Sequence, residues 1–273
     1  MDDHQLSEAW ADLGASFSAG AGADRMSFSL RSLTYPDLLG KAVDLAARQM
    51  GQPAWPNAIW LRERERINAS IKEANTRPAT LAARAFNQAV YGAHPYGFET
   101  TEANLTAISV ADMQATYAAL VLPCRAKVSI VGAITKPQAD ALVAKLLGQL
   151  PKSECSLLPA VREVDPLKQA EDKRIAFESA QAHVLIGQPG YKRDDPDFFA
   201  LLVGNQILGG GGFTSRLTNE VREKRGLTYS VYSGFQPGSH AGAFTLGLQT
   251  RPDQAVQAVQ VSKDVLAKYV ADG

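Results

Sequence analysis

The sequence predicts an α+β fold with two homologous units, each a mostly antiparallel sheet with helices packed on one face. One observation is that short alternating runs of apolar and polar residues are mixed with longer segments of helical periodicity. The other is an internal repeat at a constant offset of 216 residues, because Phe28, Leu30, Pro36 and Asp37 return as Phe244, Leu246, Pro252 and Asp253.

The region before this repeat has a slightly smaller offset of 212 residues, from Gly14 to Gly226 and from Phe17 to Tyr229. We therefore expect four extra residues in the turn of the second hairpin. Patterned segments occupy residues 170–224 ahead of the second hairpin, whereas only residues 1–12 precede the first. We expect the chain to hold one and a half units of a longer two-unit protein, truncated at both ends.

The first unit is expected to cover residues 1–150. Asp37 and Ser109 lie at helix starts, where their side chains can cap free backbone N–H groups. The expected helices are Pro36–Met50, Pro56–Asn75, Ala79–Val90, Ser109–Ala119 and Lys136–Leu147. The expected strands are Ala15–Gly20, Met26–Leu33 and Ala126–Val131.

A connector is expected at residues 151–169, because this segment holds several prolines and charges and little periodicity. The second unit then covers residues 170–273. Its expected strands are Lys173–Glu178 and Ala182–Gln188, and its expected helices before the repeated hairpin are Asp195–Leu208 and Thr214–Lys224.

The composition argues against several classes of partner. Lys plus Arg equals Asp plus Glu at 28 each, so the chain lacks the basic surface that nucleic acid or an anionic membrane attracts. No apolar run is long enough to cross a membrane, and no membrane insertion is expected. Cys124 and Cys155 show neither metal nor disulfide spacing, and free thiols are expected.

A glycine-rich loop, Gly209-Gly210-Gly211-Gly212, precedes an expected helix. Glycine permits positive φ and close backbone approach, and Thr214 or Ser215 can cap the helix that follows. Gly226 suits a left-handed helix stop before a strand. The segment is not a phosphate-binding loop, because no Gly-Lys-Ser/Thr follows it. On its own, it predicts only a loop, a helix and a hairpin.

The whole string from Gly209 to Val231 closely resembles the pitrilysin/insulinase family of zinc metallopeptidases, which includes the mitochondrial processing peptidases. The resemblance extends over nearly the entire chain. Further matching segments are Asp24–Leu33, the Arg/Glu run 62–66, Arg77-Pro78 and the run from Tyr91 to Gly97. It implies two homologous α+β halves that face each other like a clamshell.

Active members of that family hold zinc with His-x-x-Glu-His on a helix and a further glutamate downstream. The sequence contains no His-x-x-Glu-His. The resemblance places the downstream ligand at Ser70, a poor zinc ligand, although an alignment slip of one turn would bring in Glu73 or Glu65. We therefore expect no metal bound by this chain, and zinc in a partner.

The resemblance places the substrate-gripping pair of the family at Arg222 and Tyr229, whose guanidinium and phenol can donate to a peptide carbonyl. Taken alone, Arg222 would be a solvated helix residue and Tyr229 a core strand residue. The repeat has Trp10 and Phe17 at these positions. Peptide contacts are also expected at Gly209–Gly212 and along the strand containing Ala15, Ser16, Phe17 and Ser18.

These features lead to three hypotheses. The first is a non-catalytic chain that binds extended peptides and supplies Arg222 and Tyr229 to a homologous zinc-bearing chain, or that forms a homodimer. The second is part of an active zinc endopeptidase whose zinc helix lies outside this sequence. The third is a scaffold or assembly subunit without a peptidase role. The resemblance implies the bacterial periplasm as the compartment.

Overall fold

The computed structural model describes residues 1–272 and confirms the α+β class. Its residues form two compact units. Unit 1 comprises residues 1–67 and 102–159, and unit 2 comprises residues 68–101 and the described chain from 160 onward. Residues 68–101 thus pack with the C-terminal part of the chain. Because compactness and homology are different criteria, the expected homologous boundaries at 1–150, 151–169 and 170–273 stay a prediction.

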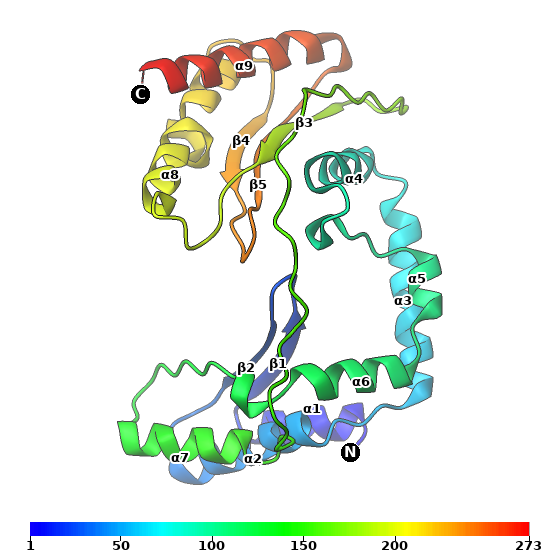
Figure 1. The fold of residues 1–273 in the computed structure, drawn as a ribbon, viewed down its shortest axis with the longest axis vertical. Helices are drawn as coiled ribbons and strands as arrows, with labels where there is room; N and C mark the ends of the chain where they lie inside the picture. The colour runs from blue at the N-terminus through cyan, green and yellow to red at the C-terminus, as the bar shows by residue number, and fades with distance from the viewer. Residues whose placement is uncertain (273) are drawn as a thin grey trace. The chain divides into compact units, whose positions relative to one another are not determined.

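Unit 1 combines helices with a two-stranded antiparallel sheet, β1–β2 (Figure 1). Its core forms around Trp10, Leu45 and Ala46, with Phe17 and Leu30 of the hairpin packed against them. The elements are α1 (Asp3–Asp12), β1 (Ser16–Ala21), β2 (Met26–Arg31), α2 (Pro36–Gly51), the first part of α3 (Asn57–Ala74), α5 (Glu102–Ala107), α6 (Val110–Leu120), the 3₁₀ turn Pro123–Arg125 and α7 (Lys136–Leu147).

Unit 2 is built on a three-stranded antiparallel sheet in the order β3–β5–β4. Its core contains the fully buried side chains of Leu217, Val221 and Leu246. The elements are α4 (Pro78–Tyr91), the 3₁₀ turn Pro95–Gly97, β3 (Ala182–Pro189), α8 (Phe198–Asn205), the π-helical turn Gln206–Gly210, the 3₁₀ turn Gly212–Thr214, the π-helical turn Thr218–Glu223, β4 (Ser230–Phe235), β5 (Ala243–Thr250), the 3₁₀ turn Pro252–Gln254 and α9 (Ala255–Asp272).

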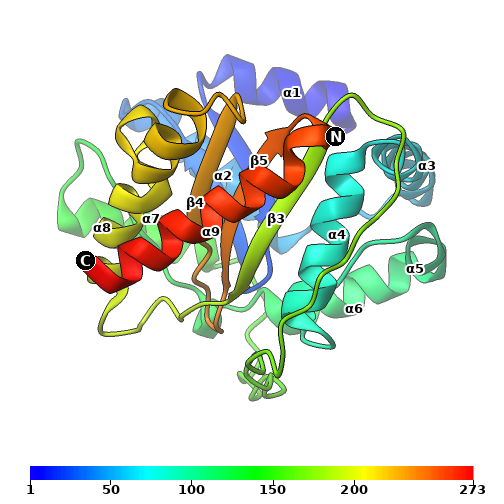
Figure 2. The same cartoon turned by 90° about the horizontal axis from the view of Figure 1, so that it is seen from above.

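Two helices cover the sheet of unit 2. Helix α9 lies across strands β3, β5 and β4 and contributes Ala258 to the core (Figure 2). Helix α4 lies along β3, where the ring of Phe86 fills the space that a Gly187 side chain would need. The hydroxyl of Tyr91, at the end of α4, accepts a hydrogen bond from the Ala243 amide at 2.9 Å. These contacts fix the sheet that carries the candidate site.

Most expected helices form, and their starts follow local chemistry. Ser109 caps α6 in a reciprocal capping box with Asp112. The expected cap at Asp37 is wrong, because Tyr35 is the N-cap residue of α2 and makes no side-chain cap bond, while Asp37 lies in the first turn. Pro36 starts this helix instead, since its fixed φ suits the first helical position.

Two expected strands do not form. Residues 126–131 and 173–178 are exposed segments without strand structure. Alternating side chains show that a segment can join a sheet, but a strand also needs a neighbour for its backbone hydrogen bonds. In unit 1, β1 and β2 pair only with each other among residues 1–272. The expected helix at Thr214–Lys224 forms in part, because residues 216 and 217 are α-helical and Thr218–Glu223 continues as a π-helix, with the 3₁₀ turn Gly212–Thr214 ahead of them.

The register of the two hairpins supports the internal repeat and corrects one detail. Phe17 pairs with Leu30, and adding 216 to both numbers gives Ser233 and Leu246, which also pair. The turns are therefore equally long when measured from the paired residues. Since Gly14 and Gly226 both have positive φ (56° and 60°) at an offset of 212, the four extra residues lie between Gly226 and the matched pairs of β4, and not in the turn.

The expectation of free thiols is wrong, because Cys124 and Cys155 form a disulfide. Their Cα atoms lie 6.2 Å apart. The bond fastens residues of the expected connector to the 3₁₀ turn of unit 1, and Arg125 donates to the Ser156 carbonyl beside it. Sequence spacing missed it because 31 positions separate the two residues, and only the folded chain brings them together.

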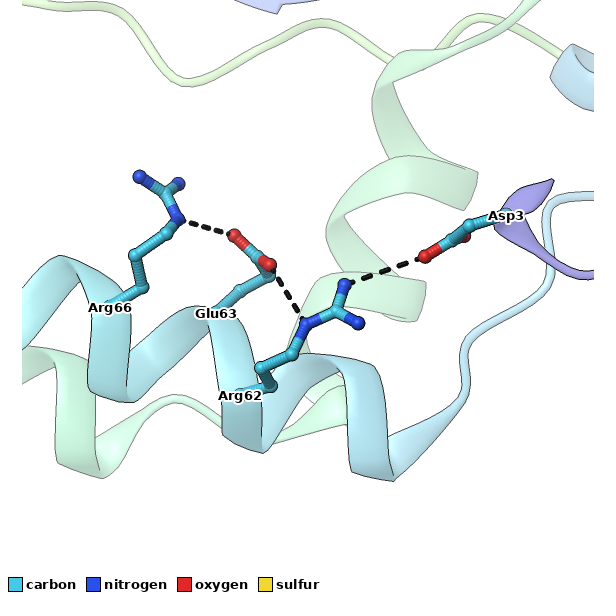
Figure 3. A network of polar contacts seen from close by, with 4 residues as sticks. All are labelled: Asp3, Arg62, Glu63 and Arg66. Atoms are coloured by element: carbon cyan, nitrogen blue, oxygen red, sulfur yellow. Dashed lines mark hydrogen bonds and ion pairs between the residues drawn. The ribbon is translucent and has the colours of Figure 1, made fainter. Parts of the chain in front are cut away.

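The charged run on α3 forms a network of ion pairs (Figure 3). Glu63 accepts from Arg66 at 2.7 Å and from Arg62 at 3.2 Å, and Arg62 also reaches Asp3 at 3.4 Å. The hydrogen bond from Arg66, aided by Arg62, lowers the pKa of Glu63. All four groups are on the surface, so we interpret the run as a salt-bridged helix face of small energetic weight.

Candidate functional site

Arg222 lies on the π-helical turn Thr218–Glu223 of unit 2. Its neighbour Val221 is fully buried, which fixes the backbone at this point. The amide of Gly226 donates to the Arg222 carbonyl at 2.8 Å, and the amide of Leu227 donates to the Val221 carbonyl at 3.0 Å. The Arg222 side chain is 27% exposed. It is therefore not a freely solvated helix residue, because its surroundings cover most of it.

Tyr229 lies just after the left-handed Gly226 and directly before β4. Leu227 and Val231 on either side are buried, but Tyr229 is 82% exposed. The Ser230 amide donates to the Thr228 hydroxyl at 3.1 Å, which holds the backbone that carries Tyr229. An alternating strand would have placed all three side chains on one face. The backbone bends at Tyr229 before β4 begins, and the side chain is exposed, so Tyr229 is not a core residue.

The two expected gripping residues are in direct contact. The guanidinium carbon of Arg222 lies over the Tyr229 ring, 5.0 Å from its centre, and over the Phe213 ring, 4.6 Å from its centre. Its Nε atom is 3.5 Å from the Glu223 carboxylate. A guanidinium over ring faces keeps its N–H groups available in its own plane. Together with the Tyr229 hydroxyl, they can donate to a carbonyl or carboxylate oxygen.

The glycine-rich loop packs beneath this site, and its glycines have different structural roles. Gly209 is buried, and a side chain there would collide with Ser233 and Leu217. Gly212 is exposed and has a φ of 57°, a conformation that other residues rarely adopt. The Ser215 hydroxyl donates to the Gly212 carbonyl and accepts from the Thr218 amide, so Ser215 caps the turn as expected.

The loop turns back on the segment that precedes it. A side chain at Gly210 would meet the Asn205 side chain, and one at Gly211 would meet the Gln206 carbonyl. The side chains of Asn205 and Ser233 hydrogen-bond to each other at 2.7 Å. The absence of side chains thus lets the loop lie close to β4. Contact of these glycines with a peptide stays a prediction.

The other expected peptide-binding residues lie in unit 1. Ala15 precedes β1, while Ser16, Phe17 and Ser18 form its first three residues. Ser16 and Ser18 are exposed, and Phe17 packs against the core. Within residues 1–272, β1 has a strand partner on one side only, which is β2. An edge of this kind can accept an added strand, and peptide pairing along β1 stays a prediction.

Ser70 lies near the end of α3 and is exposed. Of the two glutamates considered as alternatives, Glu73 is ion-paired with Arg77, and Glu65 is exposed on the same helix. Within residues 1–272, no group of three His, Cys, Asp or Glu side chains is placed to hold a metal ion. The donors described here therefore do not fit the zinc site of an active peptidase.

Unit 2 also contains a polar cluster that sequence reasoning missed. The rings of His94 and His240 lie 5.1 Å apart, and the Tyr96 hydroxyl accepts from the His240 amide at 3.0 Å. Glu163 accepts from Lys192 at 2.6 Å and from the Ala241 amide at 2.8 Å. The bond from Lys192 is the main reason why the pKa of Glu163 falls to about 2. These residues are far apart in sequence, and no local pattern predicts their meeting.

Comparisons with known proteins identify the family of this chain. Residues 107–273 match the family described as the peptidase M16 inactive domain. The chain superposes over its full length on 66% of a crystal structure of a peptidase M16 inactive domain from Pseudomonas fluorescens, with 35% identity and a TM-score of 0.95. Pitrilysin has the same fold over 98% of this chain and 30% of its own, with 18% identity and a TM-score of 0.64.

Among curated proteins, an uncharacterized zinc protease of Mycobacterium leprae is 28% identical over 214 residues, which are 77% of this chain and 48% of that protein. The chain thus spans about half the length of this relative. No helix in the described part of the chain is long and apolar enough to cross a membrane. With a family match over more than half of its residues and the same fold as M16 peptidases, the chain belongs to the peptidase M16 inactive-domain family.

Proposed function

We propose that this chain is a non-catalytic component of a pitrilysin-type zinc peptidase. It binds an extended peptide and supplies Arg222 and Tyr229 to a zinc site on a homologous chain. A zinc ion held by that chain would supply the hydrolytic chemistry. In this chain, the Arg222 guanidinium and the Tyr229 hydroxyl donate to the peptide carbonyl and to the negative charge that develops on its oxygen.

The observation that carries the proposal is the contact between Arg222 and the exposed Tyr229 ring. A tyrosine that is 82% exposed contributes little to a core, and a partly covered arginine beside it is held ready for a ligand. The described residues offer no matching set of metal ligands. Hydrogen-bond donors on a chain that lacks a set of zinc ligands support a role in peptide binding rather than independent hydrolysis.

We place the chain in the bacterial periplasm as part of the same proposal. The Cys124–Cys155 disulfide supports it, because such bonds persist in oxidising compartments and are rare where thiols are kept reduced. The similar proteins named above are bacterial, which is consistent with this proposal. Finding the chain in the cytoplasmic fraction of its cells, with both thiols reduced, would contradict this assignment.

Peptide binding can be measured without knowing the natural substrate. The probe is a fluorescein-labelled, unstructured peptide from β-casein, and the readout is fluorescence anisotropy with the purified chain. We expect saturable binding that weakens at least about ten-fold in Arg222→Ala, because a charge-assisted hydrogen bond contributes ~1.5–3 kcal/mol. Tyr229→Phe, which removes only the hydroxyl, should weaken binding about three-fold or more.

Two matched variants control for non-specific effects. Arg225→Ala removes a nearby exposed arginine that pairs with Glu220, and Tyr232→Phe removes the hydroxyl of a half-exposed tyrosine on β4. Both should bind the probe as the parent does. An equal loss of affinity in all four variants would contradict the proposed role of Arg222 and Tyr229. Saturable binding that is unchanged in Arg222→Ala and Tyr229→Phe would contradict it as well. Tightly bound zinc in the purified chain would instead favour an active peptidase.

A further inference from the structure

Phe213 is an exposed aromatic residue at the tip of the glycine-rich loop. Phe213 is 72% exposed, and the central carbon of the Arg222 guanidinium lies 4.6 Å from the centre of its ring. A phenylalanine on the surface gains little from burial, so packing does not explain this residue. The contact with Arg222 does, because a ring face attracts a cation.

The loop holds Phe213 in place although its ring is exposed. Gly212, directly before it, has the left-handed φ of 57°, and Ser215, shortly after it, is fully buried. The Thr214 hydroxyl donates to the Gly211 carbonyl at 3.0 Å, and the Ser215 hydroxyl bonds to the Gly212 carbonyl at 2.9 Å. The backbone on both sides of Phe213 is thus fixed. The position of its ring beside Arg222 is therefore a property of the fold.

The second ring at Arg222 is that of Tyr229, with its centre 5.0 Å from the same guanidinium carbon. Two rings from different turns of the chain thus restrict one long side chain, which would otherwise lose considerable rotamer freedom on binding a ligand. Stacking occupies the faces of the guanidinium and leaves its N–H edge for hydrogen bonds. The ion pair of Arg222 is through Nε, at 3.5 Å from Glu223, which leaves the terminal amino groups available for a peptide oxygen.

We infer that Phe213 is a positioning residue for Arg222, which it holds in the orientation that grips a peptide carbonyl. This inference rests on the proposed function, because it assigns Phe213 a part in the same site. Phe213 itself makes no hydrogen bond to the peptide. It lowers the entropy that Arg222 loses on binding.

The test compares Phe213→Leu, which keeps an apolar side chain but removes the ring, with Phe213→Trp, which restores a ring face. Affinity for the labelled β-casein peptide should fall about two- to five-fold in Phe213→Leu, the range that a cation–π contact at an exposed site supplies. Phe213→Trp should recover most of it. Phe98→Leu is the matched control, because Phe98 is equally exposed, at 72%, in the same unit.

A second readout does not depend on peptide binding. The Nε–H resonance of Arg222, assigned by its absence in Arg222→Ala, should be shifted by ring currents in the parent and in Phe213→Trp. It should move toward the position of an unstacked arginine in Phe213→Leu. An unchanged resonance in Phe213→Leu would overturn the contact itself.

The outcomes separate the two proposals. If Arg222→Ala weakens binding and Phe213→Leu does not, the grip stands and the positioning role is wrong. If Arg222→Ala binds the peptide like the parent, the proposed function fails, and the positioning role fails with it even where the resonance shift shows the contact. Weaker binding in Phe213→Leu without recovery in Phe213→Trp would also overturn the inference, since a ring face would then not be what Arg222 needs.

Discussion

The indole of Trp10 stacks on the ring of Phe17, with the two ring centres 5.7 Å apart and the planes 13° from parallel. The offset of 212, which holds at Gly14 and Gly226, matches Trp10 with Arg222, whereas the strand register matches Phe17 with Ser233. Arg222 contacts Tyr229 instead, which lies among the four extra residues, so unit 1 has an aromatic stack where unit 2 has a cation over a ring. Trp10 is buried and its indole N–H donates to Gln49 at 2.9 Å, whereas Tyr229 is exposed. The first pair serves packing, and the second is free to meet a ligand.

This difference in burial predicts that truncating Trp10 lowers the free energy of unfolding more than truncating Arg222 does. Trp10→Ala should lower the free energy of unfolding of unit 1 by ~3–5 kcal/mol, because it removes a large buried side chain and leaves a cavity. Arg222→Ala should cost no more than ~1 kcal/mol, the scale of an exposed cation–π contact. Urea denaturation followed by circular dichroism measures both values. Similar losses in the two variants would mean that Arg222 is structural and would weaken the case for a binding role.

The disulfide gives a prediction about stability and redox state. Protein purified without reductant should contain no free thiol and should gain two hydrogens on reduction, which mass spectrometry detects. Reduction should lower the free energy of unfolding by ~3–4 kcal/mol, since the bond closes a loop between positions 31 apart. The double variant Cys124→Ser/Cys155→Ser is the control, and a reductant should not alter its urea midpoint. If the reductant also left the urea midpoint of the parent protein unchanged, that result would contradict the disulfide.

Local chemistry explains which parts of the fold the sequence predicts well. Helix α7 has the expected bounds, Lys136–Leu147, because Thr135 caps it with Gln138 and Pro137 lies in its first turn. Gly226 takes the expected left-handed conformation for an equally local reason. The resemblance also identified Arg222 and Tyr229 as a pair, and they are in contact. Each of these features depends on residues close together in sequence.

The errors arise where distant segments decide the structure. Residues 126–131 alternate like a strand but have no partner strand among the described residues. Cys124 and Cys155 meet only after folding, and so do His94 and His240. The ring of Phe213 joins Arg222 from another turn of the chain, although the four-glycine run beside it could have drawn attention to the loop. No local pattern contains such through-space information.

The glycine-rich loop predicts a sharp contrast between two glycines. Gly209→Ala should lower the free energy of unfolding by ~1–3 kcal/mol, because the new methyl group would collide with the backbone and side chain of Ser233 and with Leu217. Gly234→Ala is the control on the neighbouring strand, where nothing lies within 4 Å of the added carbon. Thermal unfolding of both variants measures the difference. A Gly209→Ala protein as stable as Gly234→Ala would show that the loop does not pack on β4 as described.

The last prediction concerns Glu163, whose pKa falls from 4.5 to about 2, chiefly through the hydrogen bond from Lys192. A carboxyl group with a lowered pKa in the folded state stabilises the protein fully above its unfolded pKa. That contribution is lost as pH falls from about 4.5 toward 2, because the folded state must then take up a proton. Since Glu163 is 40% exposed, solvent screens the pair, and its contribution should stay below ~1 kcal/mol.

Glu163→Gln should therefore lower the stability of unit 2 slightly at pH 7 and leave it unchanged at pH 2. Lys192→Met should do the same, because Lys192 is the main cause of the lowered pKa. The double variant should be no less stable at pH 7 than the less stable single variant, since both remove one interaction. Thermal unfolding of the four proteins between pH 7 and pH 2 tests this. A parent-to-Glu163→Gln difference that persists at pH 2 would show that Glu163 acts through packing rather than charge.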